Sequence, residues 1–277
     1  MNDVIIIGAG LFGQAIGNEL IRLGREVVFI DDERPEAGSA PSGMLTKPGW
    51  YQSMGRKVYE PALENLQINY SLQECQFDLG ISKHGKVKVG GVYYVSPKDV
   101  LRNPHEKATV QSVGTDGQVH TMGATLKAKL VIVAAGVWAN QLVPVPKMQG
   151  KKGVSFFFKV PKDLETTDII RLWAPYKHLV LHRRSPTEVW TGDGTAILPE
   201  NWKDERVAEC LARIYKHTGL PKDLPVKAIM GIRPYVPKAR PCYVEQISPN
   251  VWIATGGAKN GLIAAGWAAW KIGQEVC

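Results

Sequence analysis

The sequence has few cysteines and no long hydrophobic run, and these absences exclude several classes of protein. Its four cysteines form no C-x-x-C pair and have no histidine at ligand spacing, which argues against a disulfide framework and a zinc site. The apolar run at residues 4–7 ends at Gly8, far short of a signal-peptide core or a membrane span. Internal repeats and low-complexity tracts are also missing. We therefore expect a cytoplasmic protein with reduced cysteines, no metal site and no membrane span.

The chain also lacks a concentrated basic patch, although its net charge is +8. The densest basic stretches, residues 147–152 and 177–184, are interrupted by apolar or turn residues. Nucleic-acid binding needs basic residues that gather on one face, so this pattern does not favour it. An anionic substrate or cofactor remains compatible with the charge. With 277 residues, 44% of them hydrophobic and 22% charged, the chain is expected to form one large globular domain or two interleaved ones.

The first thirty residues carry the pattern of a dinucleotide-binding βαβ unit. Residues 4–7 (VIII) predict a strand that is buried on both faces, and the motif GAGLFG follows at residues 8–13. Apolar residues at helical spacing come next, and a second strand at residues 27–30 ends at Asp31. The glycines allow a pyrophosphate to approach the backbone at the helix N-terminus, while Asp31 can accept hydrogen bonds from ribose hydroxyls. The motif leaves FAD and NAD open and disfavours NADP, because an acidic residue repels a 2′-phosphate.

Four further segments carry a family resemblance. They are GSAPSGML at residues 38–45, VIVAAGVWA at 131–139, GIRP at 231–234 and IATGGAKNGL at 253–262. Together with the fingerprint, and in the same order, they resemble the D-amino acid oxidase and glycine oxidase family of FAD-dependent amine oxidases, which favours FAD over NAD. No cysteine stands at the positions that would attach a flavin covalently, so the resemblance implies noncovalent FAD.

The resemblance implies an α/β fold with two interleaved domains. Residues 1–45, 97–145 and 231–277 would form a Rossmann-like FAD-binding domain. Residues 46–96 and 146–230 would form a smaller substrate domain built on an antiparallel sheet. The expected cofactor-binding residues are Gly8, Gly10, Leu11, Phe12, Gly13, Asp31, Asp32, Ser39, Ser42, Gly43, Met44, Val110, Ala134, Ala135, Gly136, Trp138, Arg233, Gly257, Lys259, Asn260, Gly261 and Leu262. Among these, the backbone N–H groups of residues 260–262 would face the flavin edge that gains negative charge on reduction.

The implied activity is oxidation of an amino acid or other amine, with hydride transfer to the flavin and oxygen as the electron acceptor. By the same resemblance, Arg233 would hold a substrate carboxylate, since a planar guanidinium can grip it with two hydrogen bonds. Lys259 would contact the substrate or the flavin O2 atom, or point to solvent.

The sequence departs from the family pattern in two places. The strand expected at residues 178–181 lacks the tyrosine that many members use against the carboxylate, and the nearest one is Tyr176. The segment between Met44 and Ala134 is short, and its crossover helix is reduced to residues 97–102. Two alternatives therefore stay open: an FAD-binding protein that has no oxidase activity of its own or needs a partner subunit, and, less favoured, an NAD-dependent dehydrogenase. A homo-oligomer is also compatible.

Periodicity predicts the remaining elements. Helices are expected at residues 59–66, 204–216 and 261–274. Strands are expected at residues 68–72, 87–95, 130–133, 154–160, 178–181, 189–191, 226–232 and 251–254, and a hairpin at 109–121.

Overall fold

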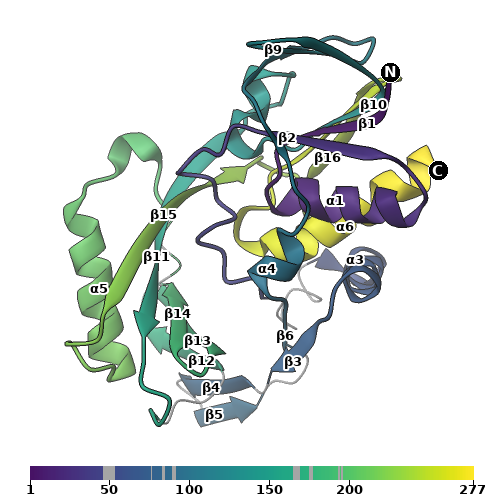
Figure 1. Ribbon diagram of the computed structural model, residues 1–277. Coiled ribbons are helices and arrows are strands. Elements are labelled where there is room, and N and C mark those ends of the chain that lie inside the picture. The colour runs from purple at the N-terminus through teal and green to yellow at the C-terminus, as the bar shows by residue number, and fades with distance from the viewer. Residues whose placement is uncertain are drawn as a thin grey trace.

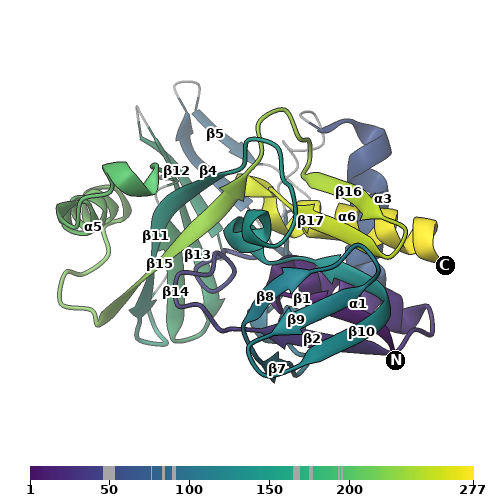
Figure 2. The ribbon, with the colours of Figure 1, turned by 90° about the horizontal axis from the view of Figure 1, so that it is seen from above.

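The computed structural model describes residues 1–45, 54–75, 77–82, 85–88, 92–164, 169–174, 177–192, 194 and 196–277. It contains two large β-sheets, which Figures 1 and 2 show at opposite sides of the molecule. In the described residues, no helix combines the length and the apolar character that crossing a membrane requires.

The first sheet has eight strands and a parallel centre. Its main path runs in the order β16 (Tyr243–Ser248), β17 (Val251–Thr255), β10 (Thr125–Val133), β1 (Asn2–Ile7), β2 (Val27–Asp31) and β7 (Glu106–Lys107). β1 pairs in parallel with both β2 and β10, and β10 pairs in parallel with β17. β8 (Val110–Val113) and β9 (Gln118–Thr121) continue from β10 as an antiparallel meander, which confirms the predicted hairpin.

Alternate residues of β1 enter two different apolar clusters. Val4 and Ile6 belong to the cluster on the helical face, whereas Ile5 and Ile7 belong to the cluster on the opposite face. The same split holds along β10 and β17. Because both faces are covered, these strands are continuous apolar runs instead of alternating ones.

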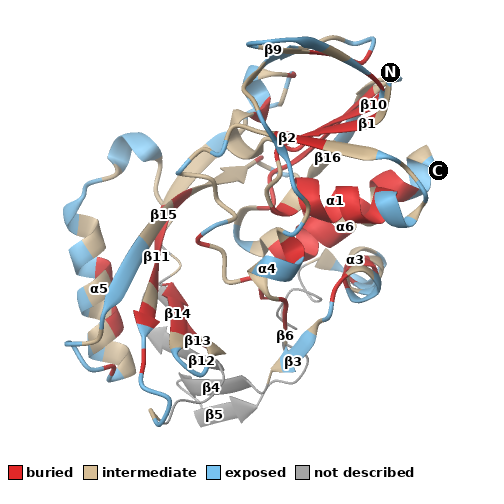
Figure 3. Cartoon of the chain, in the orientation of Figure 1, coloured by how far each residue is buried: buried red, intermediate tan, exposed pale blue. Residues whose placement is uncertain are grey.

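Two helices cover one face of this sheet. They are α1 (Leu11–Arg22) and α6 (Gly261–Val276), which lie side by side in Figure 1, and Figure 3 shows that most of α6 and the inner side of α1 are buried. α3 (Arg56–Asn69) packs against α6, where a side chain at Gly266 would come within 2.5 Å of the Ala62 carbonyl oxygen. The short α4 (Pro97–Val100) contacts α1.

The second sheet has seven strands and is mostly antiparallel. Their order is β15 (Val226–Tyr235), β11 (Gln149–Lys159), β14 (Glu188–Gly192), β13 (Lys177–Ser185), β12 (Ile169–Ala174), β4 (Phe77–Ser82) and β5 (Gly85–Lys88). One of its pairs, β12 with β4, is parallel. Both the parallel-centred sheet and this second sheet agree with the predicted fold class.

The two faces of the second sheet have different neighbours. Phe156 and Phe158 of β11 are buried in an apolar cluster with Ile214 of α5 (Glu205–Thr218). Phe157, between them in the chain, packs on the other side, where Trp190 of β14 joins the apolar cluster of the first sheet. Period-two alternation therefore separates a face that packs on α5 from a face that looks toward the first sheet.

The structure corrects one predicted strand. Residues 68–69 belong to α3, and Tyr70 follows as its C-cap, so the strand expected at 68–72 is wrong. The apolar residues there serve a helix: Leu66 is fully buried and packs toward α6, whereas Ile68 is 55% exposed. The strand expected at residues 87–95 falls partly outside the described residues, and β5 and β6 (Val92–Tyr94) stand at its ends. β6 pairs with β3 (Gln73–Cys75), which was not expected.

The helix expected at residues 204–216 is confirmed as α5, and the last helix as α6. The strands predicted at residues 154–160, 178–181, 189–191, 226–232 and 251–254 lie within or overlap β11, β13, β14, β15 and β17. Three short 3₁₀ helices complete the described elements: η1 (Gly136–Gln141), η2 (Pro199–Asn201) and η3 (Ala258–Asn260).

The division of the chain into two domains remains a prediction. Its boundary at residue 231 falls inside β15, which spans the region between the two sheets. α3, within the range 46–96, packs on the helices of the first sheet. An isolated bridge between Leu45 and Tyr94 also joins the two predicted domains, and a second one, between Ala37 and Ile232, ties the loop after β2 to β15.

Candidate functional site

A cavity of about 630 Å³ lies where the two sheets meet. This volume is within the usual range for small-molecule sites, roughly 300–1,000 Å³. The carboxyl ends of the parallel strands open into it: Ile7 of β1, Asp31 of β2, Ala134 after β10 and Thr255 of β17 all line the cavity. In an open α/β sheet this is the edge at which ligands bind.

Most of the predicted cofactor-binding residues line this cavity. They are Gly8, Gly10, Leu11, Phe12, Asp31, Asp32, Ser39, Ser42, Gly43, Val110, Ala134, Ala135, Gly136, Trp138, Arg233, Gly257, Lys259, Asn260 and Gly261. These residues come from segments far apart in the chain, and the fold brings them together around one space.

Three predicted residues do not line the cavity. Gly13 lies behind the glycine turn, where a Cβ atom would overlap the carbonyl oxygen of Gly8. Met44 and Leu262 are 1% and 2% exposed and belong to the apolar core on the helical face. The structure therefore places these three where they support the cavity wall through packing.

The turn after β1 needs glycine for conformation and for space. Gly8 has φ of +102°, and a Cβ atom there would come within 2.5 Å of the Ala134 carbonyl oxygen. A Cβ at Gly10 would stand 2.9 Å from the Ser39 hydroxyl oxygen. The backbone of this turn is consequently exposed to the cavity with no side chain in the way.

Two helix N-termini border the cavity. α1 begins after Gly10 and α6 begins after Asn260, and neither N-cap residue forms a side-chain capping hydrogen bond. No acidic residue lies in the first turn of either helix. The first N–H groups of a helix have no partner within it, and they carry a partial positive charge that favours an anion. The cavity therefore offers two separate places for negative charge.

Asp31 ties the glycine turn to the end of β2. Its carboxylate accepts the backbone N–H of Ala9 at 2.6 Å and that of Glu33 at 2.6 Å. A carboxylate has about four acceptor positions, so capacity remains for hydroxyl groups in the cavity. Next to it, Asp32 forms an ion pair with Arg34 at 2.5 Å, and the Arg34 guanidinium lies 4.7 Å from the centre of the Trp138 ring.

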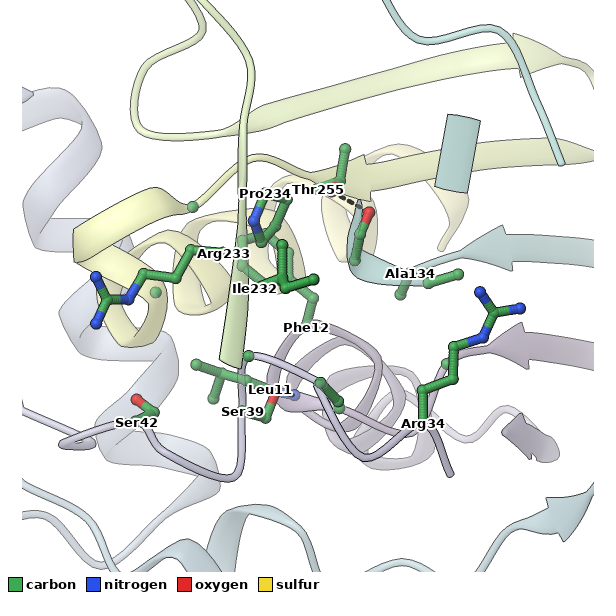
Figure 4. A pocket seen from close by; sticks show the side chains of 18 of the residues that line it. Leu11, Phe12, Arg34, Ser39, Ser42, Ala134, Ile232, Arg233, Pro234 and Thr255 are labelled. Carbon is green, nitrogen blue, oxygen red and sulfur yellow. Dashed lines mark hydrogen bonds between the residues drawn. The ribbon is translucent and has the colours of Figure 1, made fainter. Parts of the chain in front are cut away.

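Arg233 and Lys259, the two residues expected at the substrate, both line the cavity, and their contact with a substrate stays a prediction. Arg233 extends from β15, and Lys259 lies in η3, directly before α6. Figure 4 shows Arg233 and Arg34 at opposite sides of the view, with Leu11, Phe12 and Ser39 between them. The two guanidinium groups therefore stand at different ends of one elongated site.

Sequence reasoning missed several residues of the cavity wall. Arg34 follows three acidic residues, Asp31, Asp32 and Glu33, at the end of β2, so its position could have suggested it. Trp190, Ser155 and Gly192 line the cavity from β14 and β11, and they carry no local motif. Trp190 donates its indole N–H to the Pro41 carbonyl oxygen at 3.1 Å across 149 residues of sequence, a contact that only the fold creates.

A buried histidine lies behind this wall. His182 of β13 pairs in register with Trp190, is 2% exposed, and meets the Tyr94 ring edge-on with the ring centres 4.4 Å apart. Burial, together with the charge of nearby Arg184, lowers the pKa of His182 to about 3. Burial also raises the pKa of Tyr94. His182 is therefore neutral at physiological pH.

The described residues fit FAD. The cavity has room for an extended ligand, and its glycine turn carries no side chain beside the N-terminus of α1. There the Leu11 N–H donates to the Ser39 hydroxyl oxygen at 2.8 Å, which leaves the following N–H groups of the first turn for an anion. The carboxylate of Asp31 stands at the same end, and the second helix N-terminus, that of α6, provides a place for negative charge farther along the site. The Asp31 carboxylate suits a ribose, the N-terminus of α1 suits a pyrophosphate, and the N-terminus of α6 suits a ring that accepts electrons. Among the residues described, no group of three His, Cys, Asp or Glu side chains could hold a metal ion.

Several solved structures share this fold. The L-proline dehydrogenase from P. horikoshii has a TM-score of 0.82 and 14% sequence identity, with 99% of this chain and 93% of that chain covered. The glycine oxidase from Bacillus cereus has a TM-score of 0.78 and 15% identity, with 99% and 94% covered. At these identities the likeness concerns the fold alone.

Sequence comparison gives relatives and a family. Two proteins named "Bifunctional protein ThiO/ThiG", from Nostoc sp. and Trichormus variabilis, are 24% and 23% identical to the chain. The alignments cover 95% of this chain and 51% of each relative, so the chain spans about half the length of the curated relatives it matches. The family model for FAD dependent oxidoreductases matches residues 100–274, which is more than half of the chain. The chain therefore belongs to the FAD-dependent oxidoreductase family, whose cofactor is FAD.

Proposed function

We propose that this protein oxidises an amino acid or another amine by hydride transfer to noncovalently bound FAD, with oxygen as the electron acceptor. The observation that carries the proposal is the continuity of the cavity. It runs from the glycine turn and Asp31 to the arginine on β15 and the N-terminus of α6. One site can thus hold the cofactor and present a cation to a substrate beside it.

Arg233 is proposed to bind the substrate carboxylate. It extends from a strand of the second sheet into the wall shared with the Ser39–Ser42 turn. A guanidinium on a strand has a fixed direction, so a carboxylate held by two hydrogen bonds would also be oriented. Orientation of the carbon–hydrogen bond is the main requirement of a hydride transfer, since the amine proton can leave to solvent.

The start of α6 is proposed to stabilise negative charge. The backbone N–H groups of Gly261 and Leu262 belong to a helix N-terminus whose N-cap residue, Asn260, forms no side-chain capping hydrogen bond, and Lys259 lies next to it on the cavity wall. The N–H of Asn260 itself donates to the Gly257 carbonyl oxygen at 2.9 Å. Preformed donors at this place favour charge that develops during the reaction, because they need no rearrangement. Lys259 would add a full positive charge to the partial charge of the helix.

A second candidate is an FAD-binding protein that has no oxidase activity of its own or needs a partner subunit. The short segment between Met44 and Ala134 supports it, because part of the usual covering of the substrate site would be missing. A second copy or another subunit would then complete the site. An NAD-dependent dehydrogenase is the least supported alternative, since the family uses FAD.

A visible spectrum and anaerobic titration test these alternatives. We expect the purified protein to bind FAD, to show flavin absorption, and to lose that absorption when a substrate from a panel of amino acids and amines is added without oxygen. A protein that binds no FAD would refute the proposal. A yellow protein that no compound bleaches would favour the second candidate.

Arg233→Met tests the carboxylate site. We expect the KM for a carboxylate substrate to rise about tenfold or more, because a charged hydrogen bond contributes roughly 1.5–3 kcal/mol, while FAD content stays the same. Lys227→Met is the matched control, since Lys227 is an exposed cation on the same strand. An unchanged KM in Arg233→Met would remove this residue from the substrate site.

A further inference from the structure

The loop at residues 38–45 forms part of the cavity wall and holds a strained conformation. Gly38, Ser39, Pro41, Ser42 and Gly43 line the cavity. Met44, which follows, has φ of +48°, in the left-handed region that residues other than glycine rarely adopt. Such a conformation costs of order 1–3 kcal/mol and persists only where neighbouring groups determine it. The loop therefore depends on contacts from outside itself.

Those contacts come largely from the substrate half of the chain. Trp190 donates to the carbonyl oxygen of Pro41, and Arg184 donates from Nη2 to the carbonyl oxygen of Ser42. Val95 donates its backbone N–H to the Met44 carbonyl oxygen at 3.2 Å. Three donors from outside the loop thus bind the carbonyl groups of Pro41, Ser42 and Met44, which lie within four consecutive residues.

Arg184 has an unusual setting for a cation. Its guanidinium lies 5.0 Å from the ring centre of Phe157 and 5.7 Å from that of Trp190, and its Nε atom is buried without a hydrogen-bond partner among the described residues. No carboxylate among the residues that the structure describes forms an ion pair with Arg184. Its sequence neighbour Arg183 points elsewhere and donates to the carbonyl oxygens of Leu164 and Pro186. Aromatic rings attract a cation, but its buried N–H groups still need acceptors, and the acceptor here is the Ser42 carbonyl oxygen of the loop.

Trp190 explains why the loop carries glycine at residue 43. A Cβ atom at Gly43 would stand 2.7 Å from the Trp190 ring, so the backbone lies directly on the indole. The indole N–H and the indole face therefore both act on the loop. Arg184 in turn packs over that ring, so the three parts form one stack: guanidinium, indole and loop backbone.

We propose that Arg184 is a positioning residue of the FAD site, which holds the loop at residues 38–45 in its binding conformation by donating to Ser42 and by packing on Trp190. Arg184 is not among the residues that line the cavity, so it acts through the loop and does not touch the ligand. The proposal rests on FAD binding in this cavity. It assigns a role in cofactor binding to β13, a strand of the predicted substrate domain.

The test is FAD affinity, measured by titrating FAD fluorescence with apoprotein. We expect Arg184→Met to weaken binding roughly tenfold, because the loop loses a charged hydrogen bond. Arg184→Lys should recover part of this loss, since it restores a cation that can reach one carbonyl. Arg183→Met is the matched control: it removes the same charge and the same kind of hydrogen bond from the neighbouring residue, and its FAD affinity should stay within twofold of wild type.

Thermal unfolding of the apoproteins separates positioning from general destabilisation. We expect Arg184→Met and Arg183→Met to lose similar stability while only the first loses FAD affinity. If Arg184→Met does not fold, Trp190→Phe takes its place, because it removes the donor to Pro41 and keeps an aromatic face against Gly43; we expect about a fivefold loss of affinity. Wild-type affinity in the folded Arg184 or Trp190 variant would overturn the proposal, as would equal losses in the Arg183 control. A wild-type protein that binds no FAD would instead contradict the proposed function.

Discussion

The two sheets of this protein are covered in different ways. The parallel-centred sheet is apolar on both faces, since successive residues such as Ile5 and Ile6 enter separate buried clusters. The second sheet packs one face on α5, whereas its other face looks toward the cavity and contains His182, Arg184 and Trp190. A sheet covered on both sides presents only its strand ends to a ligand. A sheet covered on one side can present a whole surface of side chains.

This difference assigns different tasks to the two halves. Backbone groups and strand ends of the first sheet can bind parts of a cofactor that are the same in every relative. The second sheet instead turns side chains such as Ser155 and Trp190 toward the cavity, so this face is suited to selecting a substrate. Arg184 and Trp190 qualify this division, because they stand on the cavity-facing side of the second sheet and yet donate to carbonyl groups of the loop at residues 38–45.

The largest effect is expected in the first half, from Gly13→Ala. A Cβ atom at this residue would overlap the Gly8 carbonyl oxygen, which belongs to the backbone of the turn and cannot rotate away as the end of a side chain can. We expect a loss of at least about 3 kcal/mol in the free energy of unfolding, with loss of bound FAD. Gly123→Ala is the control, because no atom lies within 4 Å of the added group, and it should change stability by less than about 1 kcal/mol. Denaturant unfolding that ranks the two variants equally would contradict this account of the glycine turn.

Two adjacent phenylalanines compare the faces of the second sheet directly. Phe156 is 1% exposed on the α5 side, so Phe156→Ala should cost about 3–5 kcal/mol while the folded protein keeps its FAD affinity. Phe157 lies on the other face, 5.0 Å from the Arg184 guanidinium. Compared with Phe156→Ala, we expect Phe157→Ala to lower the free energy of unfolding less and to weaken FAD binding more. Unfolding curves measure the loss of stability in each variant, and FAD titrations measure the loss of affinity. If the ratio of these two losses is the same for Phe156→Ala and Phe157→Ala, the two faces do not differ.

The cavity-facing side of the second sheet should also give the protein a dependence on pH through His182. Its pKa is about 3 in the folded chain against 6.5 for the unfolded one, so the unfolded chain binds a proton first as the pH falls. Stability is therefore fully present above pH 6.5 and decreases between 6.5 and about 3, by a few kcal/mol in all. His182→Phe should flatten the decrease and leave stability at pH 8 nearly unchanged. Urea unfolding at a series of pH values tests this, and parallel curves for the variant and wild type would exclude His182 as the cause.

The sequence was sufficient to predict the first half because its signals are local. The run at residues 4–7, the glycine motif and Asp31 lie within one βαβ unit, and their roles follow from backbone chemistry. Trp190 and Arg184 could not be predicted in this way. Their contacts with Pro41 and Ser42 cross more than 140 residues, and nothing in a strand such as EVWTG marks which side chain meets a distant loop.

Errors in the prediction have the same origin. The apolar residues before Leu72 suggested a strand. In the structure Leu66 is buried against α6, whereas Ile68 is exposed on the other side of the same helix. Packing against α6 therefore favours a helix here. Met44 and Leu262 belong to segments that were expected at the cofactor, and their side chains turn into the core instead of lining the cavity. Motifs therefore located the cavity, and packing decided which side chains face it.

The smallest effect is expected at the rim of the first half, from Arg34→Met. Arg34 lies over Trp138 and pairs with Asp32, both on the cavity wall, but it is partly exposed, so each contact contributes less than about 1 kcal/mol. We expect FAD affinity to fall about threefold to fivefold, with less effect at high salt because the ion pair is screened. Arg56→Met, which removes an exposed ion pair with Glu60 on α3, should leave the affinity unchanged. A larger loss for Arg34→Met than for Arg184→Met would show that the rim of the first half matters more for FAD binding than the buried cation of the second, and it would reverse the ranking of the two arginines.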